Sequence, residues 1–248
     1  MSPNVEVLFL GTGDAFGSGG RLHTATLLRT PSARTLVDCG PSTLSALRRE
    51  RVDPGTIDTI LLTHLHGDHF GGLPFFLMDA HYASRRTRPL VIAGPRGVQE
   101  RVAQAQEIFF PGNERLPFRF PLEWAEWDDG RRRSWPGLAV TPMAVSHSKE
   151  TPCFGLRIEH GGRVLAFSGD TEWTASLIDL ARDAHLFVCE CFGYESAPPH
   201  HLDFVTLMQA RSSLTCRRLV LTHMGEPMLK RVRSIGVQCA SDGLLLLA

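Results

Sequence analysis

The chain has 248 residues, of which 43% are hydrophobic and 21% are charged, as in an ordinary soluble globular protein. This composition excludes a disordered chain, a fibrous repeat and a coiled coil, and no apolar run approaches the ~20 residues that a membrane-spanning helix needs. The 26 basic residues balance the 26 acidic ones, so charge gives no support for a general nucleic-acid binder. The unusual feature of the composition is its eleven histidines.

The first half of the chain alternates apolar, strand-like runs with segments of helical spacing. Its expected strands are residues 5–10, 24–29, 35–38, 57–63 and 90–93, and its expected helices are residues 42–51, 71–82 and 97–109. Segment 111–136 is rich in Pro, Trp and Arg and predicts no clear element. We expect it, together with the loop at 18–23, to line the substrate cleft.

The second half repeats the alternation of strands and helices. Its expected strands are residues 138–145, 154–159, 164–168, 186–189, 219–222 and 244–247, and its expected helices are residues 174–181 and 204–212. In both halves the chemically interesting residues come just after a strand, where ligands bind in α/β proteins. The pattern favours two sheets face to face with helices outside, in one domain over residues 1–248, but it does not separate this arrangement from a three-layer α/β fold.

Cellular location is indicated by the chain's beginning and by its cysteines. Residues 1–10 lack a basic stretch followed by a long apolar core, so no signal peptide is expected. The six cysteines show no CxxC spacing, and we expect them to be buried thiols. These features favour a cytoplasmic protein with no membrane association.

A concentrated histidine motif, Thr63-His64-Leu65-His66-Gly67-Asp68-His69, directly follows a buried strand. His64 and His66 lie on the same side of an extended segment, so both side chains can reach one ion. Gly67 lets the backbone turn and directs Asp68 and His69 toward a second position. Mixed nitrogen and oxygen ligands favour zinc, with manganese or iron as alternatives when carboxylates accumulate.

Two metal ions need more ligands than this motif contains, and three later strand ends offer them. His147, Asp170 and His223 each follow an expected strand. A lone histidine is more often a surface or core residue. Three potential metal ligands, each just after an expected strand, instead favour a shared metal site.

These residues, with Gly11-Thr12-Gly13, Val37-Asp38-Cys39-Gly40 and Ala240-Ser241-Asp242-Gly243, make nearly the whole chain resemble the metallo-β-lactamase fold hydrolases. The resemblance implies an αββα sandwich with two divalent metal ions between the sheets. It also implies that Asp170 bridges the metals and that Asp38 orients a ligand histidine. The first metal would be bound by His64, His66 and His147, and the second by Asp68, His69 and His223.

Other motifs are similar to the ribonuclease Z branch of this superfamily. They are His69-Phe70-Gly71-Gly72-Leu73-Pro74, Gly94-Pro95-Arg96-Gly97 and Pro152-Cys153-Phe154-Gly155. In ribonuclease Z and in the related cyclic phosphodiesterase of phosphonate metabolism, a histidine at the position of His201 protonates the leaving group. Glu190 matches the acidic residue of that branch, and Asp203 is expected to cap the following helix. His200 is an alternative proton donor to His201.

Phosphodiester hydrolysis fits this set of residues. It needs a nucleophile, neutralisation of the phosphate charge and a proton for the departing oxygen, and a hydroxide bridging two metal ions supplies the first two. His201, oriented by Glu190, would supply the third as a general acid that contributes ~10²–10⁴-fold. We therefore expect Asp68, Glu190 and His201 to be the catalytic residues.

The chain lacks two accessory features of these relatives. Ribonuclease Z usually carries a long Gly-rich and basic arm that grips tRNA, whereas only 22 residues separate His147 from Asp170 here. The cysteine cluster of the phosphonate-pathway enzyme is also missing from the early segment 14–23. We therefore expect a small or cyclic nucleotide-like phosphodiester as substrate rather than large RNA, and the resemblance implies a homodimer.

Three other functions stay open. The chain would be a carboxylic ester, thioester or lactone hydrolase of the same fold, an armless endonuclease that processes the 3′ end of tRNA, or a metal-stabilised scaffold without turnover. The complete ligand set argues against the scaffold. Four tryptophans would either stack on a base or pack in the core: Trp124, Trp127, Trp135 and Trp173.

Overall fold

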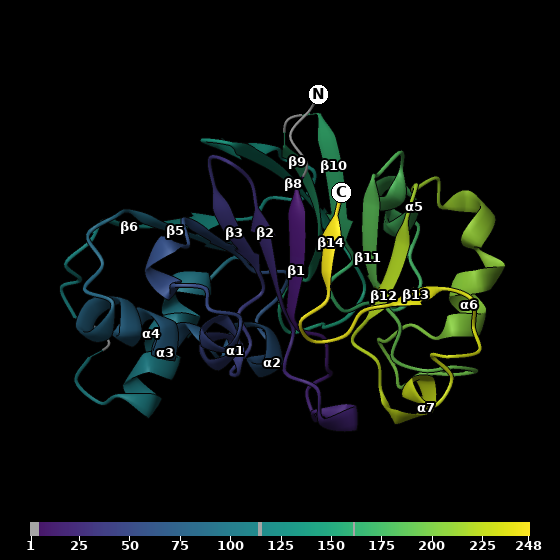
Figure 1. The fold of residues 1–248 in the computed structure, drawn as a ribbon, viewed down its shortest axis with the longest axis horizontal. Coiled ribbons are helices and arrows are strands. Elements are labelled where there is room, and N and C mark those ends of the chain that lie inside the picture. Colours follow the sequence, from purple (N-terminus) through teal and green to yellow (C-terminus); the bar gives the residue numbers. More distant parts are fainter. Residues whose placement is uncertain (1–4, 114–115, 161) are drawn as a thin grey trace.

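The computed structural model describes residues 5–113, 116–160 and 162–248. Its strands form two seven-stranded sheets that face each other, and helices cover the outer face of each sheet (Figure 1). Both sheets mix parallel and antiparallel pairs. This four-layer αββα sandwich confirms the predicted fold and excludes the three-layer alternative.

The first sheet has the strand order β14-β1-β2-β3-β4-β5-β6. Its strands are β1 (Glu6–Gly11), β2 (Ala25–Arg29), β3 (Arg34–Val37), β4 (Thr59–Leu61), β5 (Leu90–Gly94), β6 (Leu122–Glu126) and β14 (Leu245–Leu247). Its helical elements are α1 (Thr43–Arg49), α2 (Gly67–Phe70), α3 (Leu73–Met78), η3 (Asp79–Ala83) and α4 (Val98–Phe109), with the short turns η1 (Ser18–Gly20) and η2 (Pro54–Thr56). Strands β3 to β6 run parallel.

The second sheet has the order β13-β12-β11-β10-β9-β8-β7. Its strands are β7 (Arg133–Trp135), β8 (Leu138–Ala144), β9 (Phe154–His160), β10 (Arg163–Phe167), β11 (Leu186–Glu190), β12 (Leu219–Thr222) and β13 (Gln238–Cys239). Its helical elements are α5 (Ser176–Ala181), α6 (Phe204–Gln209), η4 (Arg211–Ser213) and α7 (Glu226–Leu229). Strands β10 to β13 run parallel.

Alternating side chains divide the apolar residues between the inner and outer layers. In β1, Val7 and Phe9 point between the sheets, whereas Leu8 and Leu10 pack under the helices of the first sheet. This is the two-residue period of a strand whose two faces are both covered. Trp127 also packs between the sheets, where its indole N–H donates to the Leu62 carbonyl over 2.8 Å.

Several elements differ from the sequence-based expectations. The expected helix at 71–82 divides into α3 and the π-helical turn η3, and segment 111–136 contributes the edge strands β6 and β7. The elements α2, α7 and β13 span only two to four residues, too few for periodicity to reveal them. Among the described residues, none of the helices combines the length and apolar character needed to cross a membrane.

The strand ends determine where the site forms. Asp38, His64 and Asp170 follow β3, β4 and β10, whereas Glu190 ends β11 and His223 follows β12. The parallel strands of each sheet thus deliver polar side chains at their carboxyl ends. These side chains meet at one edge of the sandwich, between the two sheets.

Candidate metal centre

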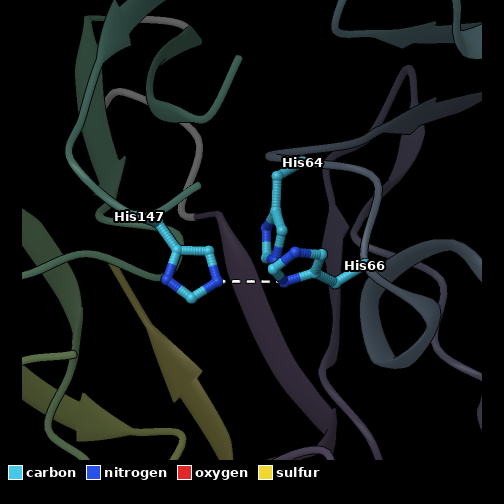
Figure 2. A group of neighbouring side chains, drawn as sticks. All are labelled: His64, His66 and His147. Carbon is cyan, nitrogen blue, oxygen red and sulfur yellow. Dashed lines mark hydrogen bonds between the residues drawn. The ribbon is translucent and has the colours of Figure 1, made fainter. Parts of the chain in front are cut away.

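The first group of candidate ligands is His64, His66 and His147, whose ligand atoms all lie within 4.8 Å of one another (Figure 2). His66 precedes α2 in extended conformation, and its Nδ1 is 3.0 Å from Nε2 of His147. His64 is fully buried, and its Nε2 has no hydrogen-bond partner. Three imidazole nitrogens therefore converge on one point.

The second group is Asp68, His69, Asp170 and His223, which is buried throughout. Nε2 of His69 lies 3.3 Å from a carboxylate oxygen of Asp68 and of Asp170, and Nε2 of His223 lies 3.2 Å from both carboxylates. Oδ2 of Asp170 is also 3.9 Å from Nε2 of His64 and 3.8 Å from Nε2 of His147. The carboxylate of Asp170 thus lies within 4 Å of histidine nitrogens of both groups.

Hydrogen bonds to the outer ring nitrogens fix the tautomers of three histidines. Asp38 accepts from Nδ1 of His69 over 2.8 Å and from the hydroxyl of Thr63, which in turn accepts from Nδ1 of His64 over 3.0 Å. The carbonyl of His200 accepts from Nδ1 of His147 over 2.8 Å. Each ring therefore presents the lone pair of Nε2 to the site, as metal-binding histidines do.

The Nε2 atoms and carboxylate oxygens of the site lie close to one another. Nε2 of His69 lies 3.4 Å from Nε2 of His223 as well as against two carboxylates. Such an arrangement is repulsive unless positive charge lies among the atoms, and the mixture of imidazole and carboxylate suits a divalent ion such as zinc. The residues therefore fit two divalent metal ions, one for each group.

Without a metal ion, protons supply part of the positive charge that these atoms require. Burial lowers the pKa of His69, but Asp170, Asp68 and Asp38 outweigh it and raise this pKa above the ordinary value. Burial alone would raise the pKa of Asp68 and Asp170, but the neighbouring histidines lower both well below the usual range. Burial and the charge of His69 lower the pKa of His64, so its ring stays neutral at pH 7. Burial lowers the pKa of His223, but Asp170 and the hydrogen bond to Asp68 outweigh it and raise the pKa to about 9. The site thus holds ionised carboxylates and at least one neutral imidazole.

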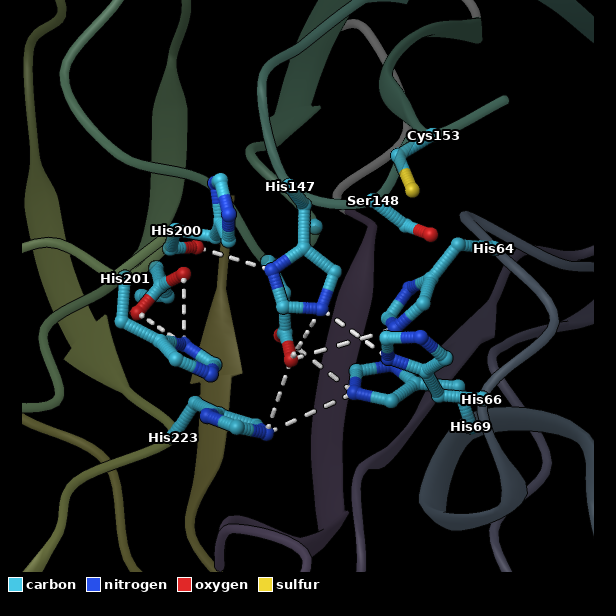
Figure 3. A network of polar contacts seen from close by, with 12 residues as sticks. His64, His66, His69, His147, Ser148, Cys153, His200, His201 and His223 are labelled. Carbon is cyan, nitrogen blue, oxygen red and sulfur yellow. Dashed lines mark hydrogen bonds and ion pairs between the residues drawn. The ribbon is translucent and has the colours of Figure 1, made fainter. Parts of the chain in front are cut away.

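Beside the two groups lies the pair formed by Glu190 and His201. Nδ1 of His201 is 3.2 Å from each carboxylate oxygen of Glu190, which is 1% exposed. A nitrogen of His201 also lies within 4.8 Å of ligand atoms of His147 and Asp170, and its ring stacks on His223 at 5.6 Å (Figure 3). Burial lowers the pKa of His201, but the hydrogen bond and charge of Glu190 raise it above the ordinary value.

The structure brings all the sequence-predicted site residues to one place. They are His64, His66, Asp68, His69, His147, Asp170, Glu190, His201 and His223. Asp38 occupies the predicted orienting position, and Asp203 caps α6 by accepting from Thr206 N over 2.8 Å. The remaining histidines belong to none of the ligand groups of the described residues: His23, His81, His160, His185 and His200.

Sequence reasoning missed three supporting residues. Thr63 links Asp38 to His64, Ser168 accepts from the amide of Glu190 over 2.8 Å, and the ring of Phe192 lies 5.0 Å from that of His201. Thr63 and Ser168 are hydroxyl residues at the ends of buried strands, a signal that could have marked them. Phe192 carries no such signal.

An open groove of about 380 Å³ adjoins the first ligand group. It is lined by His66, His147, Ser148, Lys149, Glu150, Pro199 and His200. None of the described residues of 111–136 and 18–23 borders this groove, and the expectation that these segments line the substrate cleft stays a prediction. Segment 111–136 supplies the edge strands β6 and β7.

Comparison with known proteins decides the family. Residues 33–224 match the Beta-lactamase superfamily domain. The chain belongs to the β-lactamase superfamily. It has the metallo-β-lactamase fold and the features of the ribonuclease Z-like branch of the superfamily, whose members are mostly hydrolases.

Individual relatives of this superfamily member differ in length. An uncharacterized protein of Mycobacterium leprae is 33% identical over 226 residues, which cover 89% of this chain and 78% of that protein. Ribonuclease BN of Escherichia coli is 36% identical over 165 residues, and the match covers 62% of this chain but 50% of the ribonuclease. Human tRNase Z, short form, is 26% identical with a TM-score of 0.77, and the match covers 97% of this chain and 98% of the human one.

Proposed function

We propose that the chain is a metal-dependent phosphodiesterase that acts on a small or cyclic nucleotide-like phosphodiester. The observation that carries this proposal is the Glu190–His201 pair beside the two ligand groups. The alkoxide that leaves a phosphodiester needs a proton in the transition state, and a buried, carboxylate-bound imidazolium is suited to give it. A thioester hydrolase needs no such acid, because a thiolate departs without a proton.

The ligand groups supply the rest of the chemistry. Two divalent ions, for which zinc is favoured, neutralise phosphate charge and lower the pKa of water when they are bound. His64, His66 and His147 would hold one ion, Asp68, His69 and His223 the other, and Asp170 would contact both. Asp38 and Thr63 keep two of these imidazoles in the ligating tautomer.

His201 acts as the proton donor in this proposal. Glu190 occupies Nδ1, so Nε2 is the nitrogen that can give a proton to the departing oxygen. Glu190 favours the imidazolium and, in turn, accepts hydrogen bonds from the amides of Thr171 and Leu202. These bonds fix the direction in which the His201 ring points, which the fixed geometry of general acid catalysis requires.

A second candidate function is RNA processing, which the names of ribonuclease BN and tRNase Z favour. The match to ribonuclease BN covers 50% of that protein, and the formal net charge of this chain is zero. The 22 residues between His147 and Asp170 are used for β9, β10 and their connections, which leaves no room for a basic arm. These features support a small substrate over a large polyanion.

Replacing His201 with alanine tests the proposal. In the metal-loaded enzyme, H201A should lower the rate of phosphodiester hydrolysis by ~10²–10⁴-fold, because the departing oxygen loses its proton donor. Metal content, measured by elemental analysis, should stay at the wild-type value. H160A is the matched control, since His160 ends β9 at the far end from the site. Undiminished turnover by H201A would refute the assigned mechanism.

A further inference from the structure

His200 has a backbone conformation that is uncommon for residues other than glycine. Its φ is +69°, in the left-handed region, and this conformation directs its carbonyl to Nδ1 of His147 over 2.8 Å. Glycine would adopt this conformation without strain, and asparagine tolerates it well. The conformation of His200 is thus held by a contact with a candidate ligand.

The ring of His200 faces a different region from that of His201. Glu190 binds His201 and directs it to His223, whereas Figure 3 shows the His200 ring beside His147, turned away from His223. His200 is half-buried and lines the groove next to the first ligand group. The two adjacent histidines thus separate into one that serves the reacting atoms and one that faces the groove.

The groove combines flat and polar surfaces. Pro199 and His200 line it, and Ser148, Lys149 and Glu150 add a hydroxyl, a cation and a carboxylate. The Glu150 carboxylate accepts from the Ser148 hydroxyl over 2.8 Å, which fixes its position. A ring to stack on, with a hydrogen-bond donor and an acceptor nearby, is the combination that reads an unpaired nucleobase.

We propose that this groove binds the nucleobase of the substrate and that the His200 imidazole is its stacking surface. The proposal rests on the proposed phosphodiesterase function and narrows the substrate to one that carries a nucleoside. The groove shares His66 and His147 with the first ligand group, so a base in the groove and a phosphate at the metals can belong to one nucleotide.

The tryptophans do not offer a competing surface in this groove. None of them lines it, and Trp127 and Trp124 pack in the two apolar layers of the first sheet. The sequence-based alternative that a tryptophan stacks on a base is therefore replaced by stacking on His200. Stacking on an aromatic side chain contributes roughly 5- to 150-fold to affinity for each base.

Calorimetric titration of the metal-loaded enzyme tests this assignment without requiring turnover. The two probes are a 5′-nucleoside monophosphate and methyl phosphate, which lacks the base. Wild type should bind the nucleotide roughly 5- to 150-fold more tightly than methyl phosphate. H200N tolerates the left-handed backbone and keeps the carbonyl on His147 but removes the ring, so most of this difference should disappear.

Arg51 provides the matched control. It is exposed, lies just after α1 and has a φ of +56°, so R51N makes the same type of backbone change away from the groove. R51N should bind both probes as wild type does. The assignment is overturned if wild type binds both probes equally or if H200N keeps the preference for the nucleotide. It is also overturned if H200N loses metal, because His200 would then serve only to position His147. Failure of wild type to hydrolyse any phosphodiester would refute the proposed function separately, because the binding comparison does not depend on it.

Discussion

Asp38, His200 and His223 are three of the six non-glycine residues with left-handed φ among the described residues, and all three lie at the candidate metal centre. Asp38 binds His69, the His200 carbonyl binds His147, and His223 is itself a candidate ligand. Backbone strain of this kind persists where the surrounding structure fixes it, and it gathers at functional sites. Three residues with strained backbone are therefore among those that the ligand geometry assigns to the site.

The pH dependence of hydrolysis should report the Glu190–His201 pair. Burial lowers the pKa of His201, but Glu190 raises it above the ordinary value, so activity should fall as pH rises through a pKa higher than that of an ordinary histidine. In E190Q the negative charge is lost, so the pKa of His201 falls and the alkaline limb of kcat/KM should move to lower pH. Profiles of wild type and E190Q measure this shift. An alkaline limb that stays in place would contradict the pairing.

The candidate ligands could be predicted from the sequence because each one follows a recognisable buried strand. His64, His66, Asp68 and His69 are also close together in the chain, so one motif reveals them. Thr63 and Phe192 could not be predicted, because their role depends on which side chains the two sheets bring beside them. The choice between His200 and His201 as proton donor likewise needed the structure, which pairs Glu190 with His201.

Among the elements, α2 packs closely against the loop between β3 and α1. A Cβ on Gly40 would overlap the Asp68 carbonyl oxygen, and a Cβ on Gly72 would overlap the Gly40 carbonyl oxygen. The amide of Cys39 also donates to the His69 carbonyl over 2.6 Å. Glycine is therefore required at Gly40 and Gly72 for close backbone approach, and this approach positions Asp68 and His69.

G40A should weaken both folding and metal binding. The added methyl group must displace α2, at a cost of about 1–3 kcal/mol in the free energy of unfolding. G67A is the control, since a Cβ at Gly67 meets no atom within 4 Å. Gly67 begins α2, where the extended backbone of His66 turns into the helix, and it does so without left-handed φ. Urea unfolding and zinc titration compare the two variants, and equal behaviour would refute the packing argument.

The long, regular strands were predictable from apolar and β-branched runs, and the short or edge elements were not. Segment 111–136 is the clearest case, because β6 and β7 lie at sheet edges and lack the continuous apolar run of a central strand. The expected strand 57–63 is longer than β4, because its last residues already form the approach to the site. Edge and end positions depend on tertiary pairing, which a single sequence does not encode locally.

At the scale of the molecule, each sheet supplies part of the candidate metal centre. His64, His66, Asp68 and His69 come from the first sheet, and His147, Asp170 and His223 come from the second. Metal bound here would connect the two halves of the sandwich. The repulsion among the ligand atoms that face one another would also be relieved.

Metal removal should therefore lower the thermal stability of the whole molecule. Adding zinc at 100 times its Kd should stabilise the folded state by about 2.7 kcal/mol. D170A removes the carboxylate shared by the two ligand groups, so zinc should raise the melting midpoint of this variant much less than that of wild type. Calorimetric melting with and without a chelator measures both effects. A wild-type midpoint that does not change on chelation would contradict the metal centre.

The central claim is tested most directly by one comparison of substrates with the zinc-loaded enzyme. A 3′,5′-cyclic nucleotide, bis-p-nitrophenyl phosphate, a tRNA precursor and a lactone would be assayed side by side. We expect the highest kcat/KM for the cyclic nucleotide and a strong loss of that activity in H201A. Turnover of the lactone alone would contradict the phosphodiesterase assignment, and a preference for the tRNA precursor would contradict the small substrate.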